Sequence, residues 1–444
     1  MEGGVLDSIW IKGKTRLLGE TRIQGSKNAA LPILAACVLV PGVTVLENCP
    51  DISDISCMCR ILNRIGVKTA RAGESLIVDA SQVDTTELPS EEMIRMRSSV
   101  ILAGALLGRC REVSFCQPGG CVIGDRPIDM HIGALKRLGV VFIEDAEGYG
   151  EASRNAVLQN ATAHGMLRAE ARELSGAEIH LPFPSVGATQ NAVLAAVLAK
   201  GITQIQNCAR EPEIVSLCRF LKGAGAKIAG EGSSMISVQG TERLHGSSYR
   251  IGADRIVAGT YLLSCTAAGG EVFLREAPSE ELGAVIGIAR RMGAAVREDI
   301  SGISVSRKGK LQPLESVETG VYPGFPTDLQ SALLTALCQA EGKSVVTERI
   351  FNGRFGVSEQ LNRMGAGITI AGNKAMMPGG RRLTGCTVQA GELRGGAALT
   401  AAGVCAKGTT WVENCHFIRR GYEDIVRDFK KMGADIGTET QAGL

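Results

Sequence analysis

The sequence has little of what marks several common protein classes. Aromatic residues make up only 4% of its 444 residues, and there are 5 histidines. Lys and Arg total 48 against 46 Asp and Glu, whereas proteins that bind nucleic acid or anionic membranes usually carry a basic excess. The longest apolar run, residues 29–40, contains Pro32 and is too short to span a bilayer. The first residues lack the basic-then-apolar order of a signal peptide. We therefore expect a soluble, cytoplasmic protein whose partners are neither nucleic acid nor membrane.

Cysteine is common, with 14 residues, but its pattern indicates neither disulfides nor a metal. Most cysteines lie in Ala-, Leu- and Val-rich stretches, where free cysteine packs as a small apolar residue. No CxxC pair occurs, the only close doublet is Cys57 and Cys59, and the histidines are scattered. The segment GKS at 342–344 has Leu337 where a phosphate-binding loop needs glycine, and no GxGxxG follows a strand. We therefore expect neither a metal nor a bound cofactor.

Internal repetition is the strongest feature of what is present. A closing motif, an apolar residue followed by mixed residues, Gly, and Val or Ala, recurs at intervals of roughly 68 to 86 residues, with glycines at positions 66, 139, 225, 293, 365 and 433. Each copy begins with an Ala- and Leu-rich helix, continues with a short β-branched strand and a more polar helix that ends at the glycine, and closes with one or two strands. Six copies predict an α/β protein of two domains with three units each. The first helix of each copy is apolar on nearly all sides and is predicted to be buried.

Polar residues concentrate at the starts of these predicted buried helices. The first copy opens on Lys27 and Asn28, the third on Ser185, and the fifth on Thr327 and Asp328. Helix N-termini favour anions, because their backbone N–H groups lack partners within the helix and the helix dipole is positive there. Such residues can also be simple helix caps, and that interpretation stays open for Asp328.

Several arginines also lie near the starts of the predicted buried helices or in the loops beside them. Guanidinium groups bind phosphate and carboxylate through two-point contacts, so several together would form a site for a small anion. A single arginine is more often a surface or ion-paired residue, and only convergence in space would distinguish the two. The candidates are Arg97, Arg126, Arg354, Arg394 and Arg420.

The most specific local feature is residues 117–129, QPGGCVIGDRPID. Its glycines and prolines exclude a regular helix and predict a shaped loop. Cys121 lies on this loop with Arg126 five residues away, and a nearby cation favours the reactive thiolate. From the residues alone, a reactive and a structural role for Cys121 are both open.

Six motifs, in the order of the chain, resemble one known family. They are KNAALP at 27–32, MRSS at 96–99, PGGCVIGDRPID at 118–129, PSVGAT at 184–189, PTDLQ at 326–330 and RGYE at 420–423. Together they closely resemble the UDP-N-acetylglucosamine 1-carboxyvinyltransferases, a family of enolpyruvyl transferases. The resemblance covers essentially the whole chain. The cysteine loop is highly specific, because the related 5-enolpyruvylshikimate-3-phosphate synthases lack it.

The resemblance implies a fold and a domain division. The fold is an inside-out α/β barrel of two domains, each of three repeated units with buried helices, in agreement with the six copies. An N-terminal domain is expected over residues 27–249, with the catalytic loop at about 116–128, and a C-terminal domain over residues 1–26 and 250–444. The substrates are expected between the domains, under that loop.

The resemblance also implies a reaction. The family transfers the enolpyruvyl group of phosphoenolpyruvate to the 3-hydroxyl of UDP-N-acetylglucosamine and releases phosphate, by addition and elimination through a tetrahedral intermediate. This is the first committed step of peptidoglycan synthesis, so roles in cell-wall biogenesis, cell shape and cell division are implied. Addition needs an acid and a base at the reacting atoms. The family pattern makes Asp328 the base beside the sugar hydroxyl, and Cys121 the thiol that can donate a proton, capture phosphoenolpyruvate covalently and react with fosfomycin.

The other site residues are carried over from the family's motifs. Lys27, also counted as catalytic, Arg126 and Arg420 match the positive residues that hold the phosphate and carboxylate of phosphoenolpyruvate, with Arg97 and Arg394 in support. Arg126 also begins the uridine side of the site. The remaining expected substrate-binding residues are Asn28, Pro127, Ile128, Asp129, Ser185, Val186, Gly187, Arg354 and Glu392.

Three positions depart from the family's commonest pattern. Glu392 and Arg419 stand where Asp is usual, and Val357 stands near the place of a usual His. We favour an active variant, because the principal catalytic residues are all present. The alternatives are a catalytically weakened paralogue that binds the UDP-sugar, and enolpyruvyl transfer to another acceptor.

Overall fold

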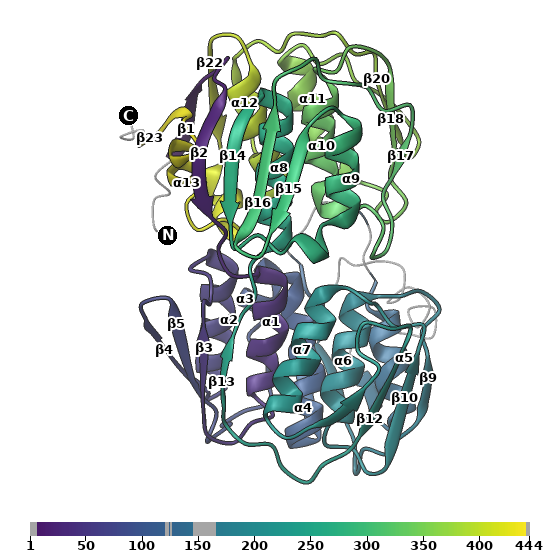
Figure 1. Ribbon diagram of the computed structural model, residues 1–444. Helices are drawn as coiled ribbons and strands as arrows, with labels where there is room; N and C mark the ends of the chain where they lie inside the picture. Colours follow the sequence, from purple (N-terminus) through teal and green to yellow (C-terminus); the bar gives the residue numbers. More distant parts are fainter. Residues whose placement is uncertain (1–6, 120–123, 125–126, 145–165, 441–444) are drawn as a thin grey trace. The chain divides into compact units, whose positions relative to one another are not determined.

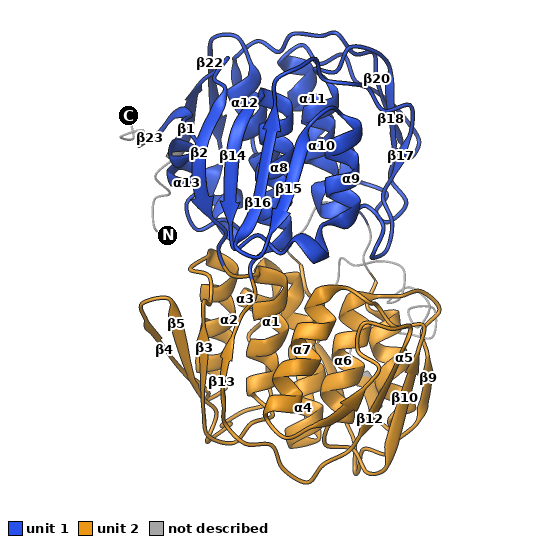
Figure 2. Cartoon of the chain, viewed as in Figure 1, with its two compact units in different colours: residues 1–24, 122–125, 253–444 blue, residues 25–121, 126–252 orange. Residues whose placement is uncertain are grey.

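The computed structural model describes residues 7–119, 124, 127–144 and 166–440. The chain forms two compact units (Figure 2): unit 2 comprises residues 25–121 and 126–252, and unit 1 comprises residues 1–24, 122–125 and 253–444. Whether these units coincide with functional domains at 27–249 and at 1–26 with 250–444 stays a prediction.

Unit 2 contains the first three copies of the repeat (Figure 1), and the expected order of elements holds in each apart from an added first element, α3 in copy two and β9 in copy three. Copy one has α1 (Lys27–Cys37), β3 (Val43–Glu47), α2 (Ser53–Arg64), β4 (Lys68–Ala72) and β5 (Ser75–Asp79). Copy two has α3 (Ser90–Arg95), η1 (Arg97–Ile101), α4 (Leu102–Cys110), β6 (Glu112–Cys116), α5 (Asp129–Arg137), β7 (Val141–Glu144) and β8 (Met166–Glu170). Copy three has β9 (Glu178–His180), α6 (Val186–Ala196), β10 (Ile202–Gln206), α7 (Pro212–Gly223), β11 (Lys227–Ala229) and β12 (Met235–Gln239), and β13 (Ser248–Arg250) follows.

Unit 1 contains the other three copies and two strands from the start of the chain, β1 (Asp7–Lys12) and β2 (Leu17–Arg22). Copy four has α8 (Arg255–Ala268), β14 (Gly270–Arg275), η3 (Ser279–Glu281), α9 (Gly283–Arg291), β15 (Ala295–Asp299) and β16 (Gly302–Arg307). Copy five has β17 (Val317–Glu318), η4 (Thr327–Leu329), α10 (Gln330–Leu337), β18 (Ser344–Thr347), η5 (Arg354–Gly356), α11 (Val357–Arg363), β19 (Thr369–Ala371) and β20 (Lys374–Met377). Copy six has β21 (Thr387–Gln389), α12 (Leu393–Cys405), β22 (Thr409–Glu413), η6 (Cys415–Arg420), α13 (Ile425–Lys431) and β23 (Asp435–Thr440).

Each copy has a small sheet, which is antiparallel in copy two and mixed in the other five. Unit 2 has the sheets β13-β3-β5-β4, β6-β8-β7 and β11-β12-β10-β9, and unit 1 has β15-β16-β14-β2, β17-β18-β20-β19 and β21-β22-β1-β23. Distant strands complete three of them. β13 pairs parallel with β3, β2 pairs parallel with β14, and β1 lies between β22 and β23. The two N-terminal strands therefore belong to unit 1, and the chain enters unit 2 after them and returns from it at β13.

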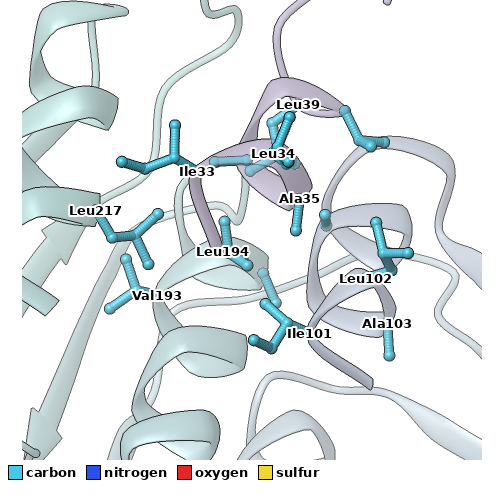
Figure 3. Close-up of a cluster of buried hydrophobic side chains, with 14 of the residues drawn as sticks. Ile33, Leu34, Ala35, Leu39, Ile101, Leu102, Ala103, Val193, Leu194 and Leu217 are labelled. Carbon is cyan, nitrogen blue, oxygen red and sulfur yellow. The ribbon is translucent and has the colours of Figure 1, made fainter. Parts of the chain in front are cut away.

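The first helices of the copies are buried inside their units, as their composition predicts. Every residue of α10 is buried, and all of α8 except its last residue. Small residues let these helices approach closely: a side chain at Gly104 of α4 would place its Cβ 2.5 Å from the Asn191 carbonyl oxygen of α6. Around them, side chains such as Ile33, Leu102 and Leu194 form a continuous apolar core in unit 2 (Figure 3). The expected inside-out arrangement of helices within sheets is confirmed.

The closing glycines end the second helices as predicted. All six have positive φ, between 88° and 104°, which L-residues rarely adopt. Gly66 follows α2 and Gly365 follows α11, and each turns the chain from its helix into the hairpin of the copy.

Two expected helices begin differently. In copy two the chain is extended at Met96, between α3 and η1, so the Ala- and Leu-rich helix begins after this residue. The helix expected to start at Thr327 opens with the 3₁₀ turn η4 after Pro326. Within the described ranges, no helix is both long and apolar enough to cross a membrane.

Candidate functional site

The buried helices of unit 1 are parallel and begin at the same end. Leu329, just before α10, packs against Gly259 in the second turn of α8. Asp328, just before α10, contacts Arg394 at the start of α12. Further along both helices, the Thr335 hydroxyl of α10 donates to the Ala398 carbonyl of α12 at 3.2 Å. The N-terminal ends of the three helices therefore lie together, and their dipoles favour negative charge at this end.

Asp328 is held between two buried arginines at this end of unit 1. Arg354 Nη2 donates to Asp328 Oδ1 at 2.8 Å, and Arg394 Nη2 donates to Oδ2 at 3.0 Å. The arginine side chains are 3% and 5% exposed, whereas the Asp328 side chain is 28% exposed. A substrate can therefore reach the carboxylate, while the two cations are fixed beneath it. Asp328 is not the N-cap of its helix. The capping role that the sequence left open for this residue is therefore excluded.

Arg394 remains positively charged in this cluster. Burial lowers the pKa of Arg394, but its interactions with Asp328, Tyr422 and Asp254 together outweigh burial, so the pKa lies above its ordinary value and the guanidinium stays ionised. Among the described residues, Arg354 Nε and Arg394 Nη1 also have no hydrogen-bond partner. These two donor atoms have almost no accessible surface, so they lie inside unit 1 and do not face an incoming ligand.

The positions that depart from the family pattern have local structural explanations. Glu392 is the N-cap of α12: its carboxylate accepts from the Arg394 N–H at 2.8 Å and from the Gly395 N–H. Val357 begins α11, is 8% exposed and belongs to the apolar core of unit 1. Arg419 is exposed. Arg354 and Arg394 keep their contacts with Asp328 in the presence of all three departures.

Arg420 ends η6 and is half-buried. The following turn is fixed by Gln24, whose amide nitrogen donates to the Gly421 carbonyl at 3.1 Å and whose amide oxygen accepts from the Glu423 N–H at 2.9 Å. Gly421 packs against Leu393 at the start of α12. This segment therefore lies beside the same helix that carries Arg394.

In unit 2 the buried helices are parallel as well. The Asn191 side chain of α6 donates to the Val100 carbonyl at 3.0 Å and accepts from the Gly104 N–H at 2.8 Å. Further along both helices, Gly108 of α4 packs against Leu194. The N-terminal ends of α4 and α6 are therefore neighbours, although α4 continues from η1 and its first N–H groups already have partners.

Lys27 and Asn28 lie in the first turn of α1, behind the capping side chain of Ser26. Lys27 Nζ lies 2.6 Å from Asp54 Oδ2, and the two side chains are 10% and 5% exposed. Asn28 is half-buried. Sequence reasoning missed Asp54: an acidic residue in the first turn of α2 is a common dipole complement, and nothing in the sequence indicates its contact with Lys27.

The other predicted residues of unit 2 surround the helix starts. Ser185 caps α6 by accepting from the Ala188 N–H, and Val186 and Gly187, both half-buried, begin that helix. Arg97 opens η1, and its guanidinium donates to the carbonyls of Pro118 and Pro127 at 3.3 and 3.4 Å.

Pro127 is exposed, Ile128 is buried, and Asp129, exposed, is the first residue of α5. The predicted Cys121 and Arg126 lie outside the described residues. In the described part of the chain, no group of three or more His, Cys, Asp or Glu side chains could hold a metal ion.

Comparison with known proteins gives close relatives over nearly the full length. The chain is 43% identical over 426 residues to UDP-N-acetylglucosamine 1-carboxyvinyltransferase 2 of Caldanaerobacter subterraneus subsp. tengcongensis, covering 96% of this chain and 98% of that protein. It is 41% identical over 436 residues to UDP-N-acetylglucosamine 1-carboxyvinyltransferase of Nitratidesulfovibrio vulgaris, covering 98% of this chain and 100% of that protein.

Solved structures of the same fold confirm the architecture. The enolpyruvyl transferase NikO from Streptomyces tendae superposes with a TM-score of 0.84 at 24% identity, over 98% of this chain and 100% of that one. An EPSP synthase from Acinetobacter baumannii gives a TM-score of 0.71 at 18% identity, with the same coverage of both chains.

The family model described as EPSP synthase (3-phosphoshikimate 1-carboxyvinyltransferase) matches residues 11–429. Together with the two near-full-length relatives, this match shows that the chain belongs to the EPSP synthase family of carboxyvinyltransferases and, within it, groups with the UDP-N-acetylglucosamine 1-carboxyvinyltransferases.

Proposed function

We propose that this protein transfers the enolpyruvyl group of phosphoenolpyruvate to the 3-hydroxyl of UDP-N-acetylglucosamine and releases phosphate. The names of relatives at 43% and 41% identity support the reaction and the acceptor. The observation that carries the proposal is the Asp328 cluster, in which an accessible carboxylate is fixed by two buried arginines. Such a cluster combines a base with a site for an anionic substrate.

Each of the two steps, the addition and the elimination, removes one proton and delivers another. In the addition, the O3–H bond of the sugar breaks, O3 bonds to C2 of phosphoenolpyruvate, and C3 of phosphoenolpyruvate gains a proton. In the elimination, C3 loses a proton, the bond from C2 to the phosphate oxygen breaks, the C2–C3 double bond forms again, and the departing phosphate takes up a proton. Asp328 takes the proton from O3 in this scheme. Arg354 and Arg394 hold its carboxylate in one orientation and add positive charge where the anionic substrate approaches.

The acid and the remaining anion contacts are assigned through the family resemblance. Cys121 delivers the proton to C3, and Arg126 and Arg420 bind the phosphate and carboxylate of phosphoenolpyruvate. Lys27 binds the same anion, and the buried Asp54 keeps its ammonium group in place at 2.6 Å. Arg97 ties together Pro118 and Pro127, the described residues on either side of the cysteine loop.

The UDP-sugar is assigned to the helix starts of unit 2. Asn28, the turn at 185–187 and residues 127–129 border the N-terminal ends of α1, α6 and α5. These ends supply N–H groups and positive dipoles for a diphosphate. We place the reaction in the cytoplasm, as the first committed step of peptidoglycan synthesis, with small-molecule substrates and no nucleic acid, membrane, metal or cofactor partner.

The test is phosphate release from phosphoenolpyruvate with and without UDP-N-acetylglucosamine, with the product identified by mass and by NMR at the 3-position. Wild type is compared with Asp328→Asn and Cys121→Ala. Asp435→Asn serves as the matched control, because Asp435 forms an exposed ion pair with Lys12. We expect sugar-dependent release that falls by about 100-fold or more in Asp328→Asn and stays unchanged in the control.

Three outcomes would overturn the proposal in different ways. Sugar binding without phosphate release from wild type would indicate the weakened paralogue. Release that requires a different hydroxylated acceptor, such as shikimate 3-phosphate, would indicate another transferase. Undiminished release by Asp328→Asn would remove that carboxylate from the reaction.

A further inference from the structure

The residue that follows the first strand after the buried helix has the same backbone conformation in several copies. In copies one, three, four and six it is in the left-handed region, with φ between 53° and 60°, and the residues are Asn48, Asn207, Glu276 and Asn414. In copy five this residue is Glu348, which follows β18 and does not have positive φ. Copies two and five depart from this turn, at Gln117 and at Glu348, and Glu348 lies shortly before Arg354 in the chain.

The Glu348 carboxylate accepts four hydrogen bonds although it is only 3% exposed. Its Oε1 accepts from the Thr319 hydroxyl at 2.8 Å and from the N–H groups of Ile350 and Phe351 at 2.8 and 3.2 Å. Its Oε2 accepts from the Thr327 hydroxyl at 3.0 Å. A buried carboxylate persists only when its oxygens are satisfied in this way, so the geometry around Glu348 is tightly defined.

The partners of Glu348 lead directly to both members of the Asp328–Arg354 pair. Thr327 immediately precedes Asp328 in η4, and the backbone at 350–351 begins the short segment that ends at Arg354. One side chain therefore joins the two segments whose ends must meet for Arg354 Nη2 to reach Asp328 Oδ1 at 2.8 Å.

We propose that Glu348 is a positioning residue for the reaction. Its hydrogen bonds to Thr327 and to the 350–351 backbone form a clamp that keeps Asp328 and Arg354 within hydrogen-bonding distance of each other. This inference rests on the proposed function, because it takes Asp328 as the base. Misplacing a reacting group by about 1 Å can cost about 100-fold in rate, so a clamp of this kind affects turnover more than substrate binding.

The experiment compares three variants in the full-length enzyme. Glu348→Ala removes the clamp. Glu348→Gln keeps it, because the amide oxygen still accepts from Thr319, Ile350 and Phe351 while the amide nitrogen donates to the Thr327 hydroxyl. Glu318→Ala is the control: it removes a carboxylate of the same sheet that forms an exposed ion pair with Arg349. We measure kcat, KM, UDP-N-acetylglucosamine binding, the thermal midpoint and the pH profile of kcat/KM.

We expect kcat to fall by about 100-fold in Glu348→Ala with sugar binding changed less than about threefold, and Glu348→Gln to recover activity to within about tenfold of wild type. The acidic limb of the pH profile should also move in Glu348→Ala, because Asp328 loses both its fixed contact with Arg354 and the neighbouring negative charge of Glu348. A merely structural role would lower the thermal midpoint without moving this limb.

The inference is overturned if folded Glu348→Ala keeps the kcat and pH profile of wild type, or if Glu318→Ala loses as much activity. If Glu348→Ala does not fold, Thr327→Val decides, because it removes one arm of the clamp and leaves the three hydrogen bonds to Glu348 Oε1 in place. It should lower kcat by about tenfold and shift the same limb, and wild-type behaviour would contradict the proposal. Failure of the proposed function is distinguishable, because wild type itself would then release no phosphate.

Discussion

At the scale of single residues, helix starts that look alike in the sequence have different roles. Ser185 accepts from the Ala188 N–H and is a helix cap, as residues of its type usually are. Asp328 stands at the corresponding start in copy five but accepts from Arg354 and Arg394 instead. The local sequence allows both roles, and the two arginines, 26 and 66 residues further along the chain, decide between them.

Lys27 provides a direct test of the anion contact in unit 2. Lys27→Ala should lower kcat/KM for phosphoenolpyruvate by about 100-fold, because a buried charge-assisted contact contributes about 2–3 kcal/mol. Steady-state phosphate release measures the effect. Lys12→Ala is the matched control, because Lys12 is 64% exposed and pairs with Asp435 at the surface. Near-normal kinetics of Lys27→Ala would contradict the assignment.

Cys121 allows a chemical test of the loop. The resemblance predicts that fosfomycin alkylates this thiol and not the other thirteen. Buried cysteines are poor nucleophiles: burial raises the pKa of Cys208 to about 11 and that of Cys338 to about 12. Intact-mass analysis should show one adduct on wild type and none on Cys121→Ala. An equal adduct on the variant would assign the reactive thiol elsewhere.

At the scale of elements, the two ends of the buried helices are contacted by different kinds of side chain. Arginines satisfy the C-terminal carbonyls: Arg109 donates to Val38, Arg111 to Leu107 and Leu198, and Arg307 to Thr266 and Ala267. Positive charge is favoured at a helix C-terminus, so these contacts stabilise the helices at the end away from the candidate site. The N-terminal ends are instead capped by polar side chains, such as Ser26, Ser185 and Asp254.

The closing glycines give a paired stability prediction. A Cβ at Gly365 would find its nearest atom 3.8 Å away, so Gly365→Ala tests positive φ alone and should cost about 1–2 kcal/mol. At Gly66 the Cβ would also lie 2.6 Å from the Asp84 carboxyl carbon, so Gly66→Ala should cost more. Calorimetry should therefore give a lower thermal midpoint for Gly66→Ala than for Gly365→Ala. The reverse order would contradict the assigned contacts.

At the scale of the whole molecule, each unit has its own apolar core and three sheets. The N-terminal strands β1 and β2 pair only with strands of unit 1, which is why the chain leaves that unit and returns to it. Sequence periodicity within one copy carries no information about this pairing, because the partners are more than two hundred residues apart.

Substrate binding should stabilise the folded protein by mass action. UDP-N-acetylglucosamine at 100 times its Kd should add about 2.7 kcal/mol to the free energy of unfolding, because the unfolded chain offers no site for it. Thermal unfolding with increasing ligand measures this, with shikimate 3-phosphate as the comparison. A midpoint raised by shikimate 3-phosphate and not by the UDP-sugar would contradict the proposed acceptor.

The sequence by itself determined the six copies, the buried first helices and the left-handed closing glycines, because these depend on composition and spacing within a few turns of chain. It also identified most candidate residues, through six ordered motifs. Only the tertiary structure decided that Arg354 and Arg394 meet at Asp328, that Asp54 pairs with Lys27, and that Glu348 joins Thr327 to the approach to Arg354. These contacts join side chains from different helices and strands, and no local pattern in the chain encodes the distance between them.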